Sequence, residues 1–252
     1  MDDVARSTTY PQPLNSLTIP VDAPLVESPA VMAPEIPAYL QETYYWCYLN
    51  PRNVKLLDRE FVVRTILWQQ HRKLQKLAFS EIRAGQSVLQ PASVYGSFAP
   101  NLAAHIGPEG SLDVVDVAEV QVLSARGKLR EYPFATVHHA NIVNFTGGPF
   151  DVVCCYFLLH EVPDVYKYRI VNLLLDKVNP GDKVVFVDYH KPRWWHPLKL
   201  NTSIVFDTLE PFAKSLWRNE IREFASESEQ FRWYKETCFG GLFQKVVATR
   251  RN

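Results

Sequence analysis

Two short stretches of the chain pair a histidine with a carboxylate: "FLLHEVPD" at residues 157–164 and "VDYHKP" at residues 187–192. Imidazole and carboxylate groups exchange protons near neutral pH, and together they also suit a divalent ion such as manganese, magnesium or iron. We predict His160 and Glu161 as catalytic groups. The predicted pool of metal ligands is Asp188, His190, His160 and Glu161. The alternative for each pair is a solvated surface position.

The stretch "SVLQPASVYGSFAP" at residues 87–100 stands where a nucleotide-binding fold has its glycine-rich loop. It contains a single glycine, and Gln90 occupies the position where an acidic residue is expected. Small residues in the loop still permit close approach of the backbone to a ligand. The residues predicted to bind a cofactor here are Gln90, Ala92, Val94, Tyr95 and Gly96, with Tyr95 also a catalytic candidate. An ordinary structural turn is the alternative.

Polar residues follow the next predicted strands as well. Asp116 comes roughly twenty residues after the loop, where an acid bonds a ribose hydroxyl pair. Asn141 presents both a donor and an acceptor to a purine edge. The neighbouring Val117, Ile142 and Phe157 are predicted to complete the cofactor site. The alternatives are a helix cap for the aspartate and a turn for the asparagine.

These residues need a scaffold that brings strand ends together, and the second half of the chain predicts one. Apolar runs begin near residues 87, 111, 135, 150 and 182 and alternate with helical segments. This pattern predicts an α/β fold with a mostly parallel sheet, which binds ligands at the carboxyl ends of its strands. Residues 231–250 predict a final antiparallel hairpin. That arrangement is similar to the Rossmann-like fold of class I S-adenosylmethionine (SAM) dependent methyltransferases.

The predicted organisation has three parts. Residues 1–34 are rich in Pro, Ser and Thr and predict a disordered tail. Residues 35–84 predict an N-terminal helical cap, with one long amphipathic helix over residues 52–82. Within the cap, Tyr44, Tyr45 and Trp46 are predicted as an aromatic lid, with Tyr45 a catalytic candidate, or else as core packing. Residues 85–252 predict the SAM-binding domain, with a helical insertion at about residues 192–225.

Composition excludes some functions. The chain has 27 basic and 27 acidic residues, so no global field favours nucleic acid. No apolar run approaches the ~18 residues of a membrane span. The four cysteines form no CxxC pair, which favours buried free thiols in a reducing compartment.

Several motifs together resemble one family: "IPAYLQETYYWCYLNP", "VLQPASVYGSFAPNLA", "LDVVDVAEVQ", "VVFVDYHKPRWWHPL", "FDTLEPFAKSLW" and "FGGLFQKVV". They are similar to the RquA family of rhodoquinone biosynthesis proteins, relatives of the ubiquinone and menaquinone methyltransferases, and the resemblance spans residues 35–248. It implies an enzyme of low-oxygen respiration. Such an enzyme converts ubiquinone to rhodoquinone by replacing a ring methoxy group with an amino group, with SAM as amino donor and Mn²⁺ assisting.

Gln90 bears on that implied chemistry. In a standard SAM site, a strand-end carboxylate favours the charged ammonium, because an opposite charge raises an amine pKa. We therefore hypothesise that Gln90 leaves the SAM amino group free to become a neutral nucleophile. Replacing Gln90 with Glu tests this idea.

A ubiquinone substrate has a long isoprenoid tail, so the resemblance also implies peripheral contact with a membrane. The expected place is the cytoplasmic or mitochondrial matrix side of an inner membrane. Trp194 and Trp195 are candidates for the contact, or else cover the core. Two other functions remain open: a conventional SAM-dependent quinone methyltransferase, and an inactive SAM-fold scaffold of a quinone-biosynthesis complex.

Overall fold

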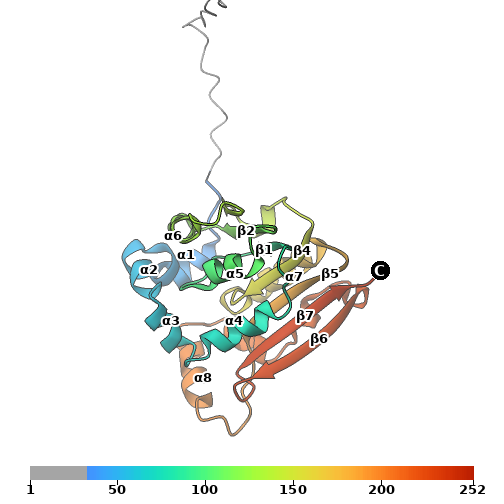
Figure 1. Cartoon of the computed structure of the whole chain (residues 1–252). Helices are drawn as coiled ribbons and strands as arrows, with labels where there is room; N and C mark the ends of the chain where they lie inside the picture. Colours follow the sequence, from blue (N-terminus) through green and yellow to red (C-terminus); the bar gives the residue numbers. More distant parts are fainter. Residues whose placement is uncertain (1–32) are drawn as a thin grey trace, which may run out of the picture. The chain divides into compact units, whose positions relative to one another are not determined.

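A computed structural model describes residues 33–252, which form one compact unit (Figure 1). The predicted disordered tail lies almost wholly outside the described residues. Within residues 33–252, no helix combines the length and apolar character that crossing a membrane requires.

A seven-stranded sheet forms the centre of the molecule and confirms the predicted fold class. Its strands follow the order β3-β2-β1-β4-β5-β7-β6. The first five are parallel, and β7 runs antiparallel to both of its neighbours. The bounds are β1 (Ser87–Gln90), β2 (Ser111–Asp116), β3 (Ala135–His139), β4 (Phe150–Tyr156), β5 (Val178–Tyr189), β6 (Phe231–Cys238) and β7 (Phe243–Arg250).

Helices cover both faces of the sheet, as the apolar strands require. The helices that pack on one face are α4 (His71–Phe79), α5 (Phe98–Ile106) and α6 (Glu119–Leu129). The opposite face is covered by α7 (Asp164–Asp176). Side chains alternate between these two layers, so Val88 belongs to the first core cluster and the next residue, Leu89, to the second. The chain reverses after α5 at Gly107, whose φ of 75° favours glycine.

The cap contains several short helices in place of the single long helix predicted over residues 52–82, and that prediction is wrong. The helices are α1 (Ala38–Tyr44), the π-helix η1 (Tyr45–Leu49), α2 (Pro51–Leu57), α3 (Glu60–Ile66) and α4. The first break occurs at Asp58, whose carboxylate turns inward and accepts hydrogen bonds from Gly96 N and Ser124 Oγ, each at 2.8 Å. The second break contains Trp68 and Gln69, both with positive φ.

The region between β5 and β6 is mostly helical, as expected for the insertion. It contains α8 (Lys199–Thr208) and the 3₁₀ helices η4 (Ala213–Trp217), η5 (Ile221–Phe224) and η6 (Ser228–Gln230). Two further 3₁₀ turns, η2 (Ile142–Asn144) and η3 (Leu159–Glu161), follow β3 and β4. The turn η3 places the first His–Glu pair directly at the carboxyl end of β4.

Candidate functional site

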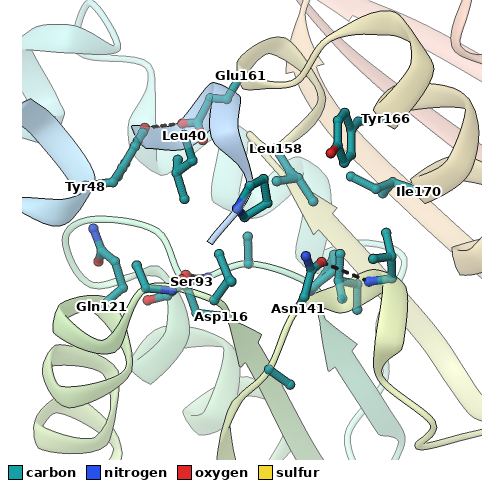
Figure 2. Close-up of a pocket in the computed structure, with 18 of the residues that line it drawn as sticks. Leu40, Tyr48, Ser93, Asp116, Gln121, Asn141, Leu158, Glu161, Tyr166 and Ile170 are labelled. Atoms are coloured by element: carbon teal, nitrogen blue, oxygen red, sulfur yellow. Dashed lines mark hydrogen bonds between the residues drawn. The ribbon is translucent and has the colours of Figure 1, made fainter. Parts of the chain in front are cut away.

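A cavity that holds about 650 Å³ of space, open solvent included, lies at the carboxyl ends of β1, β2 and β3 (Figure 2). We call it the polar cavity, after the side chains of Ser93, Asp116, Gln121, Asn141 and Glu161 among its lining residues. Five of the predicted cofactor residues line it: Ala92, Asp116, Val117, Asn141 and Ile142. Figure 2 shows Tyr48 and Glu161 on the side opposite Asp116 and Asn141. The strand-end rule therefore located this cavity correctly.

Asp116 holds the loop after β1 and begins the next helix at the same time. Its carboxylate accepts hydrogen bonds from Ser93 N at 2.9 Å and from Ala118 N at 2.8 Å. Burial raises the pKa of Asp116 to about 6, although these backbone donors favour the charged form. The carboxylate thus fixes the shape of the cavity as well as lining it.

Asn141 has a similar double position. Its side-chain oxygen accepts a hydrogen bond from Val143 N at 3.2 Å and caps η2. Because that bond uses the oxygen, the amide N–H groups remain as donors toward the cavity. Asn141 therefore both caps a turn and faces the cavity, although these two positions were predicted as alternatives.

Gln90 and Gly96 line neither this cavity nor the second one described below, and both have contacts that support the loop. Gln90 is fully buried, and its Nε2 donates to the carbonyl oxygen of Ala92 at 2.8 Å. Its Oε1 has no partner among the described residues. Gly96 has a φ of 77°, and a Cβ there would lie 3.1 Å from the Glu60 carboxylate. The loop therefore packs against the cap at this glycine.

A second cavity, of about 800 Å³, lies between the cap and the carboxyl ends of β4 and β5. Its walls are mainly apolar and aromatic and include Trp46, Leu57, Val63, Ile66, Leu67, Tyr156 and Tyr189. Val94, Tyr95 and Phe157, which were predicted to bind the cofactor, line this second cavity and not the first. Beyond Ser93 the loop runs toward the cap, where the Tyr95 hydroxyl donates to the Cys47 carbonyl.

The two cavities adjoin. Tyr48, Ser93 and Glu161 line both of them. A ligand in the polar cavity and a ligand in the apolar cavity would therefore meet at a wall made of one hydroxyl-bearing ring, one small residue and one carboxyl group.

His160 is held at the floor of the apolar cavity by Asp188. Its Nδ1 lies 2.9 Å from Asp188 Oδ1, and its Nε2 lies 3.6 Å from Glu161 Oε1. Burial alone would lower the pKa of His160, but the Asp188 carboxylate, with help from Glu161 and Glu210, raises it to about 9. The imidazole is therefore protonated at neutral pH and able to donate a proton into the cavity.

Two carboxyl groups face this histidine, and each bonds a tyrosine of the cap. Tyr48 donates to Glu161, and Tyr44 donates to Glu210 at 2.8 Å. Burial raises the pKa of both carboxyl groups, and the positive His160 opposes the increase. Glu161 is consequently a stronger base than an exposed carboxylate when it is ionised.

Glu210 and Tyr48 were not among the predicted site residues. Glu210 follows α8, and the buried Lys167 helps to hold that segment by donating to the Val162 and Phe212 carbonyls at 2.6 and 3.0 Å. The available signals were an acid inside the apolar stretch "FDTLEPF" and a third tyrosine in "YYWCYLNP".

The aromatic lid differs from its prediction. Tyr44 is buried, and Tyr48 reaches the shared wall of the two cavities. Tyr45 is exposed and lines neither cavity, so its position does not support a catalytic role. The turn of the π-helix after Tyr44 directs the neighbouring rings to opposite sides.

The predicted metal-ligand pool is not assembled. His190 lies outside both cavities, with Nδ1 2.8 Å from the Gly241 carbonyl oxygen. Both Asp188 oxygens already accept backbone N–H groups, those of Leu159 and Tyr189 among them. Across the described part of the chain, no group of three or more His, Cys, Asp or Glu is placed to hold a metal ion. The residues present therefore do not fit the predicted manganese site.

Comparison with known protein families identifies one that matches this chain. Residues 61–246 match the family model described as the ubiE/COQ5 methyltransferase family. The chain belongs to this family. The match starts inside the cap and ends in β7. It includes His160, Glu161, Asp188 and Glu210, but not the lining residues of the two cavities that lie between Pro37 and Leu57.

Named relatives in the family are only moderately similar. The ubiquinone/menaquinone biosynthesis C-methyltransferase UbiE of Ralstonia nicotianae is 26% identical over 168 residues, which cover 66% of this chain and 65% of that protein. The demethylmenaquinone methyltransferase of Shouchella clausii is 25% identical over 176 residues, covering 67% and 70%. The chain thus spans slightly less than two thirds of the Ralstonia relative.

Solved structures support the fold assignment. An O-methyltransferase family protein from Burkholderia thailandensis has a TM-score of 0.62 at 12% identity, over 82% of this chain and 64% of that one. The N-methyltransferase NodS from Bradyrhizobium japonicum, in complex with S-adenosyl-L-homocysteine, has a TM-score of 0.54 at 16% identity, over 81% and 94%. The fold is that of class I SAM-dependent methyltransferases.

Proposed function

We propose that this protein is a SAM-dependent enzyme that modifies the ring of a quinone, and that the reaction replaces a methoxy group of ubiquinone with an amino group to give rhodoquinone. The observation that supports it most is the shared wall of the two cavities. A polar cavity fit for SAM adjoins an apolar, aromatic cavity fit for a quinone ring, and proton-transferring groups stand where they meet.

The residues divide the work between the cavities. Asp116 and Asn141 bind the nucleoside part of SAM, through the ribose hydroxyl groups and the adenine edge. Tyr95, Tyr156 and Phe157 enclose the quinone ring. The reacting atoms then meet beside Tyr48 and Glu161.

The overall reaction fixes which protons must move. In the displacement, which needs two proton transfers, the ring carbon exchanges its bond to the methoxy oxygen for a bond to nitrogen, the amine loses a proton, and the methoxy group leaves as methanol after taking up a proton. The Cα–N bond of SAM breaks afterwards. The Cα proton and the electron pair of the Cα–H bond pass to the quinone, which becomes the hydroquinone, and water hydrolyses the resulting imine to the α-keto acid. Ubiquinone, SAM and water together give the amino-hydroquinone, methanol and the α-keto acid that corresponds to SAM. Atoms and electrons balance in this equation, and the hydroquinone is the reduced form of rhodoquinone.

His160 and Glu161 supply the two proton transfers. The protonated His160 donates toward the ring oxygen or the departing methoxy group, where negative charge develops. Glu161, made more basic by burial, accepts the proton that the attacking amine loses. Because both pKa values are raised, His160 is protonated and Glu161 is ionised at the same time only between about pH 8 and pH 9.

Gln90 affects the donor through charge and through the loop. A neutral amide leaves the amine of SAM without a carboxylate that would favour its ammonium form. The same amide donates to the Ala92 carbonyl, so Gln90→Glu changes the charge and also removes a hydrogen bond. Gln90→Met removes the hydrogen bond alone and is the matched control. Lower turnover in the Glu variant than in the Met variant, at equal SAM occupancy, supports the charge argument.

Mn²⁺ enters the proposal only as an assay condition. The family resemblance implies the ion, but the described residues do not assemble the predicted ligands. No step is assigned to it, and turnover is measured with and without it.

The deciding experiment uses purified protein, ubiquinone, and SAM labelled in its amino nitrogen or in its methyl carbon. Mass spectrometry then shows which atom reaches the ring. Labelled nitrogen in the quinone, with methanol released, supports amino transfer. A labelled methyl group on the ring identifies a conventional quinone C-methyltransferase, the second candidate, which the names of the relatives favour. No SAM binding by calorimetry contradicts both and supports a scaffold.

A further inference from the structure

The outer side of the cap carries large apolar side chains that pack on nothing. Leu56, Phe61 and Ile66 are exposed, and Phe61 retains 75% of its accessible surface. The helix α3 contains no fully buried residue at all. A surface helix normally turns its apolar residues toward the core, so this exposure marks a face that meets something else.

This face continues into the apolar cavity. Trp46 and Ile66 line the cavity, yet they remain 43% and 47% exposed. The same two side chains therefore form both the cavity wall and the outer surface, which places the mouth of the cavity on this face. Tyr45, which lines neither of the two main cavities, is exposed beside Trp46.

The charge of one segment of the cap, residues 51–76, differs from that of the chain. The whole chain is neutral, whereas residues 51–76 contain seven basic and two acidic side chains. The two acids have partners: Asp58 pairs with Lys128, and Glu60 lies 3.3 Å from His71. The basic residues on α2 and α3 are Arg52, Lys55, Arg59 and Arg64, and all four are exposed.

We propose that this face, the cap surface, docks on a lipid bilayer with anionic headgroups. The cap surface consists of Trp46, Leu56, Phe61 and Ile66 with the basic residues Arg52, Lys55, Arg59 and Arg64. Aromatic and aliphatic side chains enter the boundary of the bilayer while neighbouring basic residues contact anionic headgroups. The mouth of the apolar cavity then opens onto lipid, so an isoprenoid quinone reaches the site without crossing water.

The consequence for the substrate rests on the proposed function, whereas docking itself does not. The binding test therefore uses the full chain and vesicles that contain neither quinone nor SAM. One set of vesicles is made of phosphatidylcholine, and the other contains phosphatidylglycerol as well. The wild-type protein is expected to sediment with the anionic vesicles, and binding is expected to weaken as salt rises.

The test variant is the double substitution Leu56→Ser with Phe61→Ser. Neither side chain lines either main cavity, and both are exposed, so the fold is expected to persist. Binding to anionic vesicles should fall roughly tenfold, from the apolar area lost. Val165→Ser is the matched control, since Val165 is 72% exposed on α7, and its binding should equal that of the wild type. Equal binding by the double variant overturns the proposal.

A second outcome would also overturn it. If light scattering shows a dimer that the double variant converts to a monomer, and vesicle binding is absent, the cap surface joins two copies of the chain. Trp194→Ser in the same assay tests the separate prediction of membrane contact at Trp194 and Trp195, which are both exposed.

Activity separates docking from the proposed reaction. With a short-tailed quinone in solution, the double variant should turn over at the wild-type rate. With a long-tailed quinone in vesicles, its rate should fall by about the loss in binding, roughly tenfold. If the wild type binds vesicles but acts on neither quinone, the proposed function fails while docking stands.

Discussion

The two halves of the site use their polar groups differently. At the ends of β1, β2 and β3, the side chains of Gln90, Asp116 and Asn141 bond backbone groups of the strand-end loops. At the ends of β4 and β5, ionisable side chains bond one another, as His160 does with Asp188 and Glu161 with Tyr48. The first half is therefore a fixed shape, and the second is a set of groups that exchange protons.

This difference indicates that the first half of the site binds a ligand and that the second half takes part in the chemical step. A side chain that is hydrogen-bonded to the backbone keeps one geometry, and it recognises a ligand by the match between their shapes. Buried ionisable groups that face one another have shifted pKa values, which is a property of catalytic groups. Substitutions in the first half should therefore change SAM affinity, and those in the second should change the rate of the chemical step.

The largest effect is expected from His160→Ala. Loss of the proton donor should lower turnover about a thousandfold, while SAM affinity measured by calorimetry changes less than twofold. His190→Ala is the control, because His190 lies outside both cavities and should leave turnover near the wild-type value. Equal losses in the two variants would show that the division between the halves is wrong.

The pH dependence of turnover should be set only by the ionisable groups at the ends of β4 and β5. The acid His160 has a pKa raised to about 9, so the rate falls as pH rises through that value. The base Glu161 has a pKa raised to about 8, so the rate falls as pH drops below it. The two groups interact, so the two pKa values seen in a pH–rate profile are properties of the pair and not of either residue alone. We expect turnover to be highest in a narrow range between these two values. It should fall tenfold for each pH unit below the lower value or above the higher one. Flat turnover from pH 6 to 8 at saturating SAM would contradict these roles.

Asp116→Ala should weaken SAM binding roughly tenfold, because Ser93 N and Ala118 N lose their buried acceptor. Turnover at saturating SAM should stay within a few-fold of the wild type. Calorimetry gives the affinity, and steady-state kinetics give the rate. A large loss in the saturated rate with unchanged affinity would place Asp116 in the chemistry instead.

The smallest effect is expected from Tyr48→Phe. The tyrosine hydrogen bond lowers the pKa of Glu161, so its loss should raise that pKa further and move the acid limb to higher pH. The shift should be less than about one unit and the rate at the optimum should change only a few-fold. Tyr45→Phe, on the exposed side of the same segment, is the control and should leave the profile unchanged.

Local sequence pattern was enough for the sheet and for half of the site. Each apolar run became a strand, because strands buried on both faces need continuous apolar residues. The strand-end rule then placed Asp116, Asn141 and the His160–Glu161 pair beside cavities. The rule does not give the direction of a side chain, so it could not separate Val94, Tyr95 and Phe157, which line the second cavity, from the residues that line the first.

Distant contacts account for what could not be predicted. The cap breaks at Asp58 because its carboxylate bonds Gly96 and Ser124, which lie far along the chain. Glu210 enters the site only because the insertion folds back over β4 and β5. His190 leaves it because its backbone N–H bonds Leu242 and its ring bonds Gly241, both near the β6–β7 turn. No local spacing contains that information.

The segment from Pro37 to Tyr48 forms part of both cavity walls. Pro37, Tyr39 and Leu40 line the polar cavity, and Trp46 and Cys47 line the apolar one. A quinone enters by the mouth beside Trp46 and Ile66, but once bound it packs against this stretch, which also forms a wall of the SAM cavity, so SAM leaves only after the quinone product has left. We therefore expect a compulsory order of arrival and departure. Release, rather than bond making, would then set the steady-state rate, and turnover would slow in proportion to solvent viscosity.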